Sequence, residues 1–269
     1  MKSAVARAVV AASVVAALGS VAACGGSGDD DAKSAKPGAS EGAGAGTGSG
    51  ADGGQGDGRR GGGSRAATAL EKSAIAADDI KGYKVEKADE AAPRPAGPVS
   101  PAVCAPLAAV LGPGAPPKAE AHAGRVLNRS GENDPTTTDV GLSAYPRGVA
   151  EKSMDGLRAA LKSKKCSTFG VGGDRFLGVH ALPGQDRGDE SVSYQLALRR
   201  GKFITRESVT IVRDGGTLVA FEASNAYDPE GVQQDRENEK DGMKGGGTAT
   251  ADQDPKVAPA IVEAQLGKM

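Results

Sequence analysis

Four side chains of this sequence could take part in acid, base or nucleophilic chemistry: Glu207, Glu222, His122 and His180. Two carboxyl groups at a suitable separation can hydrolyse glycosidic bonds, and the two glutamates fall on neighbouring predicted strands. A histidine base needs a nucleophile and an orienting group within hydrogen-bond reach. Residues 67–269 contain neither a G-x-S-x-G nor an S-x-x-K motif. We therefore expect no catalysis, and we predict that both glutamates are solvated surface charges.

The two histidines have structural interpretations. His180 lies in the strand-like segment 176–182, where alternation places it on the face of Phe176 and Leu182. This position predicts a partly buried structural histidine. His122 stands between alanines in another predicted strand and belongs to no motif. Neither histidine is predicted to be a catalytic base.

The third reactive residue type is cysteine, and Cys24 follows an export signal. Residues 1–23 have a positive start, an apolar stretch over residues 8–18 and small residues before the cysteine. The V-A-A-C sequence ending at Cys24 resembles a bacterial lipobox. We expect a cleaved signal peptide and a diacylglyceryl anchor on Cys24 with acyl chains such as palmitate, which would hold the protein on the extracytoplasmic side of the cell membrane. A plain A-x-A cleavage site is the alternative, whereas a transmembrane helix needs about 20 apolar residues.

The other two cysteines, Cys104 and Cys166, are predicted to form a disulfide. Three cysteines are an awkward number in a secreted protein, but lipidation of Cys24 leaves one pair in an oxidising compartment. Two unrelated buried thiols are the alternative. No C-x-x-C or H-x-x-x-H spacing occurs, so no metal site is expected.

Composition divides the mature chain into a tether and a folded domain. Glycine occupies 16 of the 42 positions from residue 25 to residue 66, and all eight aromatic residues follow that segment. Residues 24–66 are therefore predicted to be a disordered tether that begins with the lipidated cysteine, and residues 67–269 an extracytoplasmic domain. Two G-x-G-x-x-G matches, at residues 48–53 and 56–61, neither follow a strand nor open a helix. They predict no dinucleotide site, and we expect no cofactor.

Periodicity predicts the elements of the domain. Residues 192–198 alternate, residues 203–213 and 217–223 follow as strands joined by an Asp214-Gly215 turn, and residues 119–128, 136–145 and 176–182 are also strand-like. Predicted helices cover residues 67–77 and 101–111, a longer stretch opening at Pro146, and a last stretch opening at Asp254-Pro255. The polar residues 228–254 are predicted to be a mobile loop. The expected fold is α+β, with a mostly antiparallel sheet of five to six strands and flanking helices.

Three short segments carry a resemblance: D-I-K-G-Y ending at Tyr83, C-A-P-L beginning at Cys104, and C-S-T-F beginning at Cys166. They resemble secreted lipoproteins of high-GC actinobacteria and, more distantly, the extracellular sensor domains of receptor-type actinobacterial serine/threonine kinases. The resemblance implies an antiparallel sheet with helices and a ligand-binding cleft. Those sensor domains usually carry two disulfides, whereas this chain can form one.

These observations predict a membrane-anchored binding or sensor module without enzymatic activity. Its partners would be the membrane, through the lipid anchor, and an unidentified small ligand or envelope protein. The net charge of −1 excludes the usual basic nucleic-acid binder. A cell-envelope hydrolase with an unrecognised site and a structural scaffold for an envelope complex remain alternatives.

Overall fold

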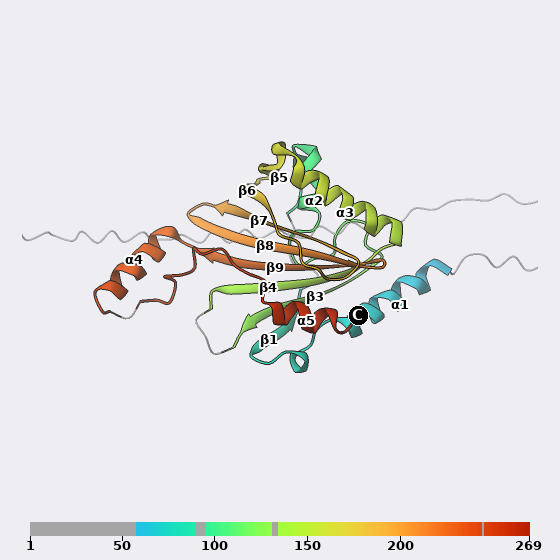
Figure 1. Cartoon of the computed structure of the whole chain (residues 1–269), viewed down its shortest axis with the longest axis horizontal. Coiled ribbons are helices and arrows are strands. Elements are labelled where there is room, and N and C mark those ends of the chain that lie inside the picture. The colour runs from blue at the N-terminus through green and yellow to red at the C-terminus, as the bar shows by residue number, and fades with distance from the viewer. Residues whose placement is uncertain (1–57, 90–94, 131–133, 244) are drawn as a thin grey trace, which may run out of the picture. The chain divides into compact units, whose positions relative to one another are not determined.

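Three long neighbouring strands, β7, β8 and β9, form from the part of the sequence that alternates most regularly. The computed structural model describes residues 58–89, 95–130, 134–243 and 245–269, with side chains from residue 65 onward. Its strands form one antiparallel sheet in the order β1-β3-β4-β9-β8-β7-β6-β5-β2 (Figure 1). The strands are β1 (Tyr83–Lys87), β2 (Val99–Ser100), β3 (Ala121–Arg129), β4 (Thr136–Ala144), β5 (Thr168–Val171), β6 (Asp174–Leu182), β7 (Glu190–Arg200), β8 (Phe203–Asp214) and β9 (Thr217–Tyr227).

The predicted class, α+β with an antiparallel sheet, is confirmed, but the predicted size of five to six strands is wrong because the sheet has nine. Two of the strands that the sequence did not predict, β2 and β5, have two and four residues. Alternation cannot be recognised over such short segments. They become strands because β2 pairs with β5 and β5 pairs with β6.

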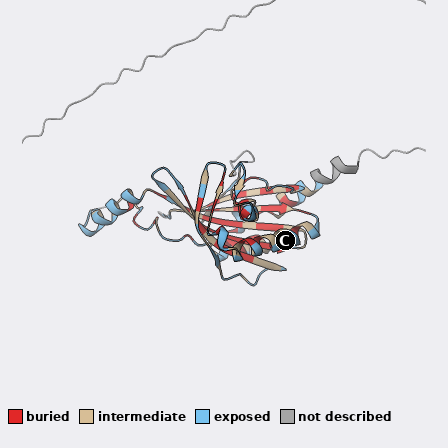
Figure 2. Cartoon of the chain, turned by 90° about the horizontal axis from the view of Figure 1, so that it is seen from above, coloured by how far each residue is buried: buried red, intermediate tan, exposed pale blue. Residues whose placement is uncertain are grey.

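Helices cover both faces of the sheet. They are α1 (Gly58–Ser73), α2 (Ala105–Ala108), α3 (Arg147–Lys162), α4 (Pro229–Lys240) and α5 (Pro259–Leu266). Ile211, Leu218 and Ala220 pack with α2 and α3 on one side, which we call the α3 face. Val219 and Phe221 point to the other side and pack with α1 and α5, and we call this the α1 face. Figure 2 shows the buried residues concentrated in the strands.

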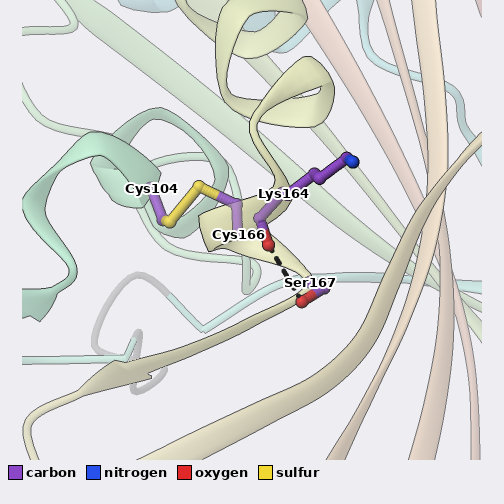
Figure 3. The surroundings of a disulfide bond; sticks show 4 residues. All are labelled: Cys104, Lys164, Cys166 and Ser167. Atoms are coloured by element: carbon purple, nitrogen blue, oxygen red, sulfur yellow. Dashed lines mark hydrogen bonds between the residues drawn. A yellow bond between two sulfur atoms is a disulfide. The ribbon is translucent and has the colours of Figure 1, made fainter.

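Helix α3 confirms the prediction of a long helix after Pro146. Ala150, Met154 and Leu157 recur on one side of it and are each 1% exposed or less. A disulfide between Cys104 and Cys166, as predicted, connects the short helical turn before α2 to the one that follows α3 (Figure 3). The bond therefore holds α2, and the start of the loop that follows it, against the end of α3.

The predicted mobile loop over residues 228–254 is wrong in its first half, which forms α4. Asp228 caps this helix by accepting a hydrogen bond from the backbone, and Pro229 occupies its first turn. Asp235 then accepts two hydrogen bonds from Thr248, which fixes the segment that returns from the helix. The sequence carried the cap-and-proline signal, but the polar composition concealed it.

The last helix also begins later than predicted. Its first residue is Pro259 and its N-cap is Ala258, whereas the sequence placed the start at Asp254-Pro255. Proline suits the first helical turn because its missing N–H has no acceptor there in any case. Ile261 is fully buried, as predicted, on the α1 face.

Helix α1 starts inside the segment predicted to be tether and ends at Ser73 instead of residue 77. Its Glu71 pairs with Arg125 of β3 at 2.9 Å, and Arg125 also donates to the carbonyl of Ile75. The signal peptide, Cys24 and most of the predicted tether lie outside the described residues. Within the described ranges, no helix combines the length and the apolar character needed to cross a membrane.

Candidate functional site

Three carboxyl groups from three adjacent strands lie together on the α3 face. Asp139 of β4 is the direct partner of Glu222 of β9. Glu222 pairs with Val209 of β8, and Glu207 lies two residues before Val209 on that strand, on the same face of the sheet. Glu207 and Glu222 are only 7% and 9% exposed. The prediction that these two glutamates are solvated is therefore wrong. We call Asp139, Glu207 and Glu222 the carboxylate cluster.

Burial raises the pKa values of two members of this cluster, Asp139 and Glu207, and repulsion from the other carboxyl groups adds to the shift of Glu207. Burial raises the pKa of Glu207 well above its usual range; the charge of Glu222 adds to the shift and Arg200 opposes it. Burial also raises the pKa of Asp139 from 3.8 to about 6. Arg200 is itself bound to Asp174, with a 2.9 Å hydrogen bond. Asp139 and Glu207 therefore hold protons at pH values where ordinary carboxyl groups are ionised.

One carboxyl oxygen of Glu207 is buried inside the protein. Its Oε2 has no hydrogen-bond partner in the described part of the chain. Buried polar atoms in folded proteins are nearly always hydrogen-bonded, so an exception calls for an explanation. The unpartnered atom belongs to the group whose pKa both other carboxyl groups raise.

A loop between α2 and β3, residues 109–120, covers part of the cluster. The backbone N–H of Gly112 donates to Oε2 of Glu222 at 2.9 Å. The Nε2 atom of His122 lies 2.9 Å from the carbonyl oxygen of Pro113. A carbonyl only accepts, so Nε2 must carry the proton. One carboxylate and one imidazole of the sheet thus hold the α2–β3 loop in place.

Two glycines make room for His122. Gly124 and Gly141 are direct partners on β3 and β4, next to the histidine. A methyl group added at Gly141 would approach Cε1 of His122 to 3.2 Å. The other ring nitrogen, Nδ1, lies 2.9 Å from Oγ of Ser143, and in the neutral imidazole it accepts that hydroxyl proton.

Beneath the loop is a small cavity lined by His122, Asp139 and Glu222. It has apolar walls from Ile211 and Leu218 of the α3 face. Its volume is about 20 Å³, which is room for about one water molecule. A larger groove of about 500 Å³, which lies beside α1 and includes Arg125, shares His122 and the loop with the cavity. The carboxylate cavity and a hollow of ligand size thus share His122 and Pro113 in their walls.

The other histidine lies apart from this cavity. His180 is exposed and its Nδ1 lies 2.9 Å from the carbonyl of Gly178. The predicted partial burial is wrong because the strand pairing shifts between Leu177 and His180, where Gly178 has a positive φ of 64°. The bulge turns Val179 toward the core in place of the histidine.

The described residues contain no group of three His, Cys, Asp or Glu side chains arranged to hold a metal ion. Sequence reasoning paired Glu207 with Glu222 but missed Asp139 and the role of His122. Asp139 sits between hydrophobic and β-branched residues in a strand, and a charge in such a segment was the available signal. Its closeness to Glu222 depends on the pairing of β4 with β9, which are far apart in sequence.

Comparisons with known proteins find distant structural neighbours. No family model matches the chain, and no curated protein matches it. An uncharacterised protein of Mycobacterium smegmatis, described as an Rv0999 ortholog, is 14% identical with a TM-score of 0.33, over 54% of this chain and 75% of that one. The extracellular domain of PknH from Mycobacterium tuberculosis is 12% identical with a TM-score of 0.35, over 56% of this chain and 82% of that one.

Proposed function

We propose that this protein is an extracytoplasmic lipoprotein that acts as a binding or sensor module, with the carboxylate cavity beneath the α2–β3 loop as its ligand site. One observation carries the proposal. The side chains that hold the loop, Glu222 and His122, also line the cavity. A ligand that bonds to these groups competes with the loop for them. Ligand binding therefore shifts the loop toward an open conformation, and a sensor requires such a coupled change.

The energetics of the cluster support a functional role. Two buried carboxyl groups and one partly buried carboxyl group lie near one another in a sheet where apolar residues would pack at lower cost. Proteins retain such costly arrangements mainly where activity needs them. A pocket with apolar walls and a few convergent polar groups is the usual form of a small-molecule site.

The two histidines provide a matched test of the site. We expect a screen of small polar metabolites against the full chain to find a compound that stabilises the wild type and His180→Ala, and that binds His122→Ala at least about tenfold more weakly. The same compound should change hydrogen exchange at the amides of Gly112, Gly114 and Ala115. If no compound stabilises the protein, or if binding is the same in both histidine variants, the proposed site is wrong.

The membrane anchor makes a separate prediction. Cys24→Ala should move the protein from the membrane fraction to the soluble fraction, because two acyl chains on one residue give stable attachment and the export signal alone does not. Ser27→Ala, three residues away, is the matched control and should stay with the membrane. Mass spectrometry of the N-terminal peptide should find the acyl chains. Retention of Cys24→Ala in washed membranes would exclude lipidation as the anchor.

The second candidate function, a hydrolase, is favoured by one specific observation. Asp139, with its pKa near 6, lies directly opposite Glu222, and a carboxyl group that keeps its proton beside a second carboxyl group is the usual acid/base arrangement of hydrolases. If this candidate is correct, activity on an envelope glycan should be lost in Glu222→Ala and kept in His180→Ala. Ligand binding without turnover would favour the sensor instead.

A further inference from the structure

We propose that a second groove, on the α1 face of β6, β7 and β8, binds a small phosphate monoester. Its volume is about 290 Å³, and Arg199, Arg206 and His180 line it; we call it the arginine groove. Arg206 lies six residues before Val212 on β8, and Val212 packs on the α1 face, so alternation places the groove there. The carboxylate cavity lies on the other face, so either proposal can fail without the other.

The register of three strands brings the side chains of the groove together. Leu177 of β6 pairs with Ala197 of β7, which in turn pairs with Arg206 of β8. Arg199 pairs with Ile204, one row nearer the turn between β7 and β8. Three partly buried apolar side chains therefore form the floor of the groove, and the two arginines are diagonal neighbours on it.

The positive charge of this surface is not balanced. Arg206 donates to Asp254 at 2.6 Å, and Asp254 is the one carboxylate among the lining residues. Arg199 makes no ion pair with the described residues, and neither does Arg175, which lies opposite it on β6 when the register of β6 and β7 is continued. Like charges on directly opposed strand residues destabilise a sheet. A bound anion would remove this repulsion.

The N–H donors that remain match a phosphate group. Arg199 uses its Nε for the carbonyl of Gly201, and Arg206 uses Nε and Nη1 for Tyr227 and Asp254. Both Nη atoms of Arg199 and Nη2 of Arg206 have no partner in the described part of the chain. A phosphate monoester offers three acceptor oxygens and a charge of about −2, whereas a carboxylate offers two oxygens and one charge. Three donors and the excess of arginine thus favour the phosphate.

A bulge in β6 supplies the other end of the groove. Gly178, with a φ of 64°, accompanies the shift in pairing between Leu177 and His180. Bulges redirect side chains and are common beside functional sites. Nδ1 of His180 donates to the carbonyl of Gly178, so Nε2 is the ring nitrogen left for a ligand. With its phosphate at the arginines, an ester would lie over the apolar floor and present a hydroxyl group to Nε2.

Titration calorimetry on the full chain in a mild detergent tests the ligand class, with phenyl phosphate as the probe. Inorganic phosphate is the head without the body, benzoate has one charge and two oxygens, and benzyl alcohol has no charge. We expect inorganic phosphate and benzoate to bind at least about fivefold more weakly than the probe, and benzyl alcohol not to bind. If the probe does not bind, or if benzoate binds as tightly, the inference is wrong. Equal affinity for inorganic phosphate would also contradict it, because the floor would then contribute nothing.

Three variants locate the binding. Arg199→Gln should weaken binding of phenyl phosphate at least about tenfold, because it removes a charge and two donors. Arg200→Gln is the matched control, since that arginine is bound to Asp174 and projects from the other face, and it should keep the affinity of the wild type. Asp254→Asn should strengthen binding at least about threefold, because it removes the carboxylate of the groove and releases Nη1 of Arg206. Damage to the fold cannot produce this gain. Equal affinity of Arg199→Gln and Arg200→Gln, or weaker binding to Asp254→Asn, would overturn the inference.

Discussion

Cys104→Ala/Cys166→Ala is expected to lower the free energy of unfolding by about 4 kcal/mol, the largest single effect we predict for the domain. The bond spans 62 residues of sequence, and a loop of that length restricts the unfolded chain by about this amount in the entropic model. The total stability of a domain is about 5–15 kcal/mol. We therefore expect a large fall in the urea midpoint and partial unfolding at 37 °C.

The disulfide also positions the site. The segment between its cysteines contains the α2–β3 loop and the β3–β4 hairpin, and hence His122 and Asp139. Wild type reduced with dithiothreitol is the matched control and should unfold at the same urea concentration as the double variant. A loss of less than about 1 kcal/mol in both samples would show that the packing of Cys104 and Cys166, each 1% exposed or less, holds α2 without the bond.

The second large effect is a gain of stability. Asp139→Asn and Glu207→Gln should each stabilise the protein at pH 7.5 and have little effect at pH 4. The pKa of both groups is raised in the folded state, and burial is the largest cause. A carboxyl group with a raised pKa stabilises the folded state while it is protonated. This contribution is lost as the pH rises from the pKa of the unfolded state through the pKa of the folded state. The amide side chains of the two variants stay neutral, so the variants keep this stability as the pH rises.

The pH window follows from the shift of Asp139. Its contribution is complete below about pH 4 and is lost by about pH 6, because its pKa rises from 3.8 to about 6. A shift of this size corresponds to about 3 kcal/mol at most. Since Asp139 is not fully buried, we expect Asp139→Asn to gain about 1–2 kcal/mol at pH 7.5.

Urea unfolding at pH 4 and pH 7.5 measures this effect, with the exposed Glu230→Gln as the control that should change little at either pH. A stabilised variant that binds a compound from the screen more weakly would show the trade between stability and function expected of a binding site. Lower stability of Asp139→Asn at pH 7.5 would mean that ionised Asp139 makes a favourable interaction, and the cluster would then be a structural network.

Local sequence patterns were sufficient to predict a feature that depends on residues close together in the sequence, or on a small number of possible partners. Helix α3 followed from the recurrence of Ala150, Met154 and Leu157. The disulfide followed from cysteine arithmetic, since Cys104 and Cys166 were the pair left after the lipobox cysteine. The strands β7, β8 and β9 followed from alternation and short turns, because adjacent antiparallel strands need no distant information.

The sequence failed where a single backbone geometry reversed a pattern. One bulge at Gly178 exposed His180 and turned the partly buried Val179 toward the core, although alternation had assigned the histidine to the core face. In α4, composition suggested a loop, but the Asp228 cap and Pro229 start a helix that Asp235 then ties to the returning chain. In both segments a few local hydrogen bonds outweighed the average character of the residues.

By itself, the sequence determined the expected cellular location of the protein, its α+β class and the residues able to form its disulfide. Only the tertiary structure decided the site. Asp139 and Glu222 are distant in the chain, and the register of β4 against β9 makes them direct partners. The α2–β3 loop then covers part of the cluster through the hydrogen bond from Gly112 to Glu222, and burial raises the pKa of Asp139. Burial and charge proximity are properties of the packed sheet, so no local pattern could turn these acids from surface charges into a candidate binding site.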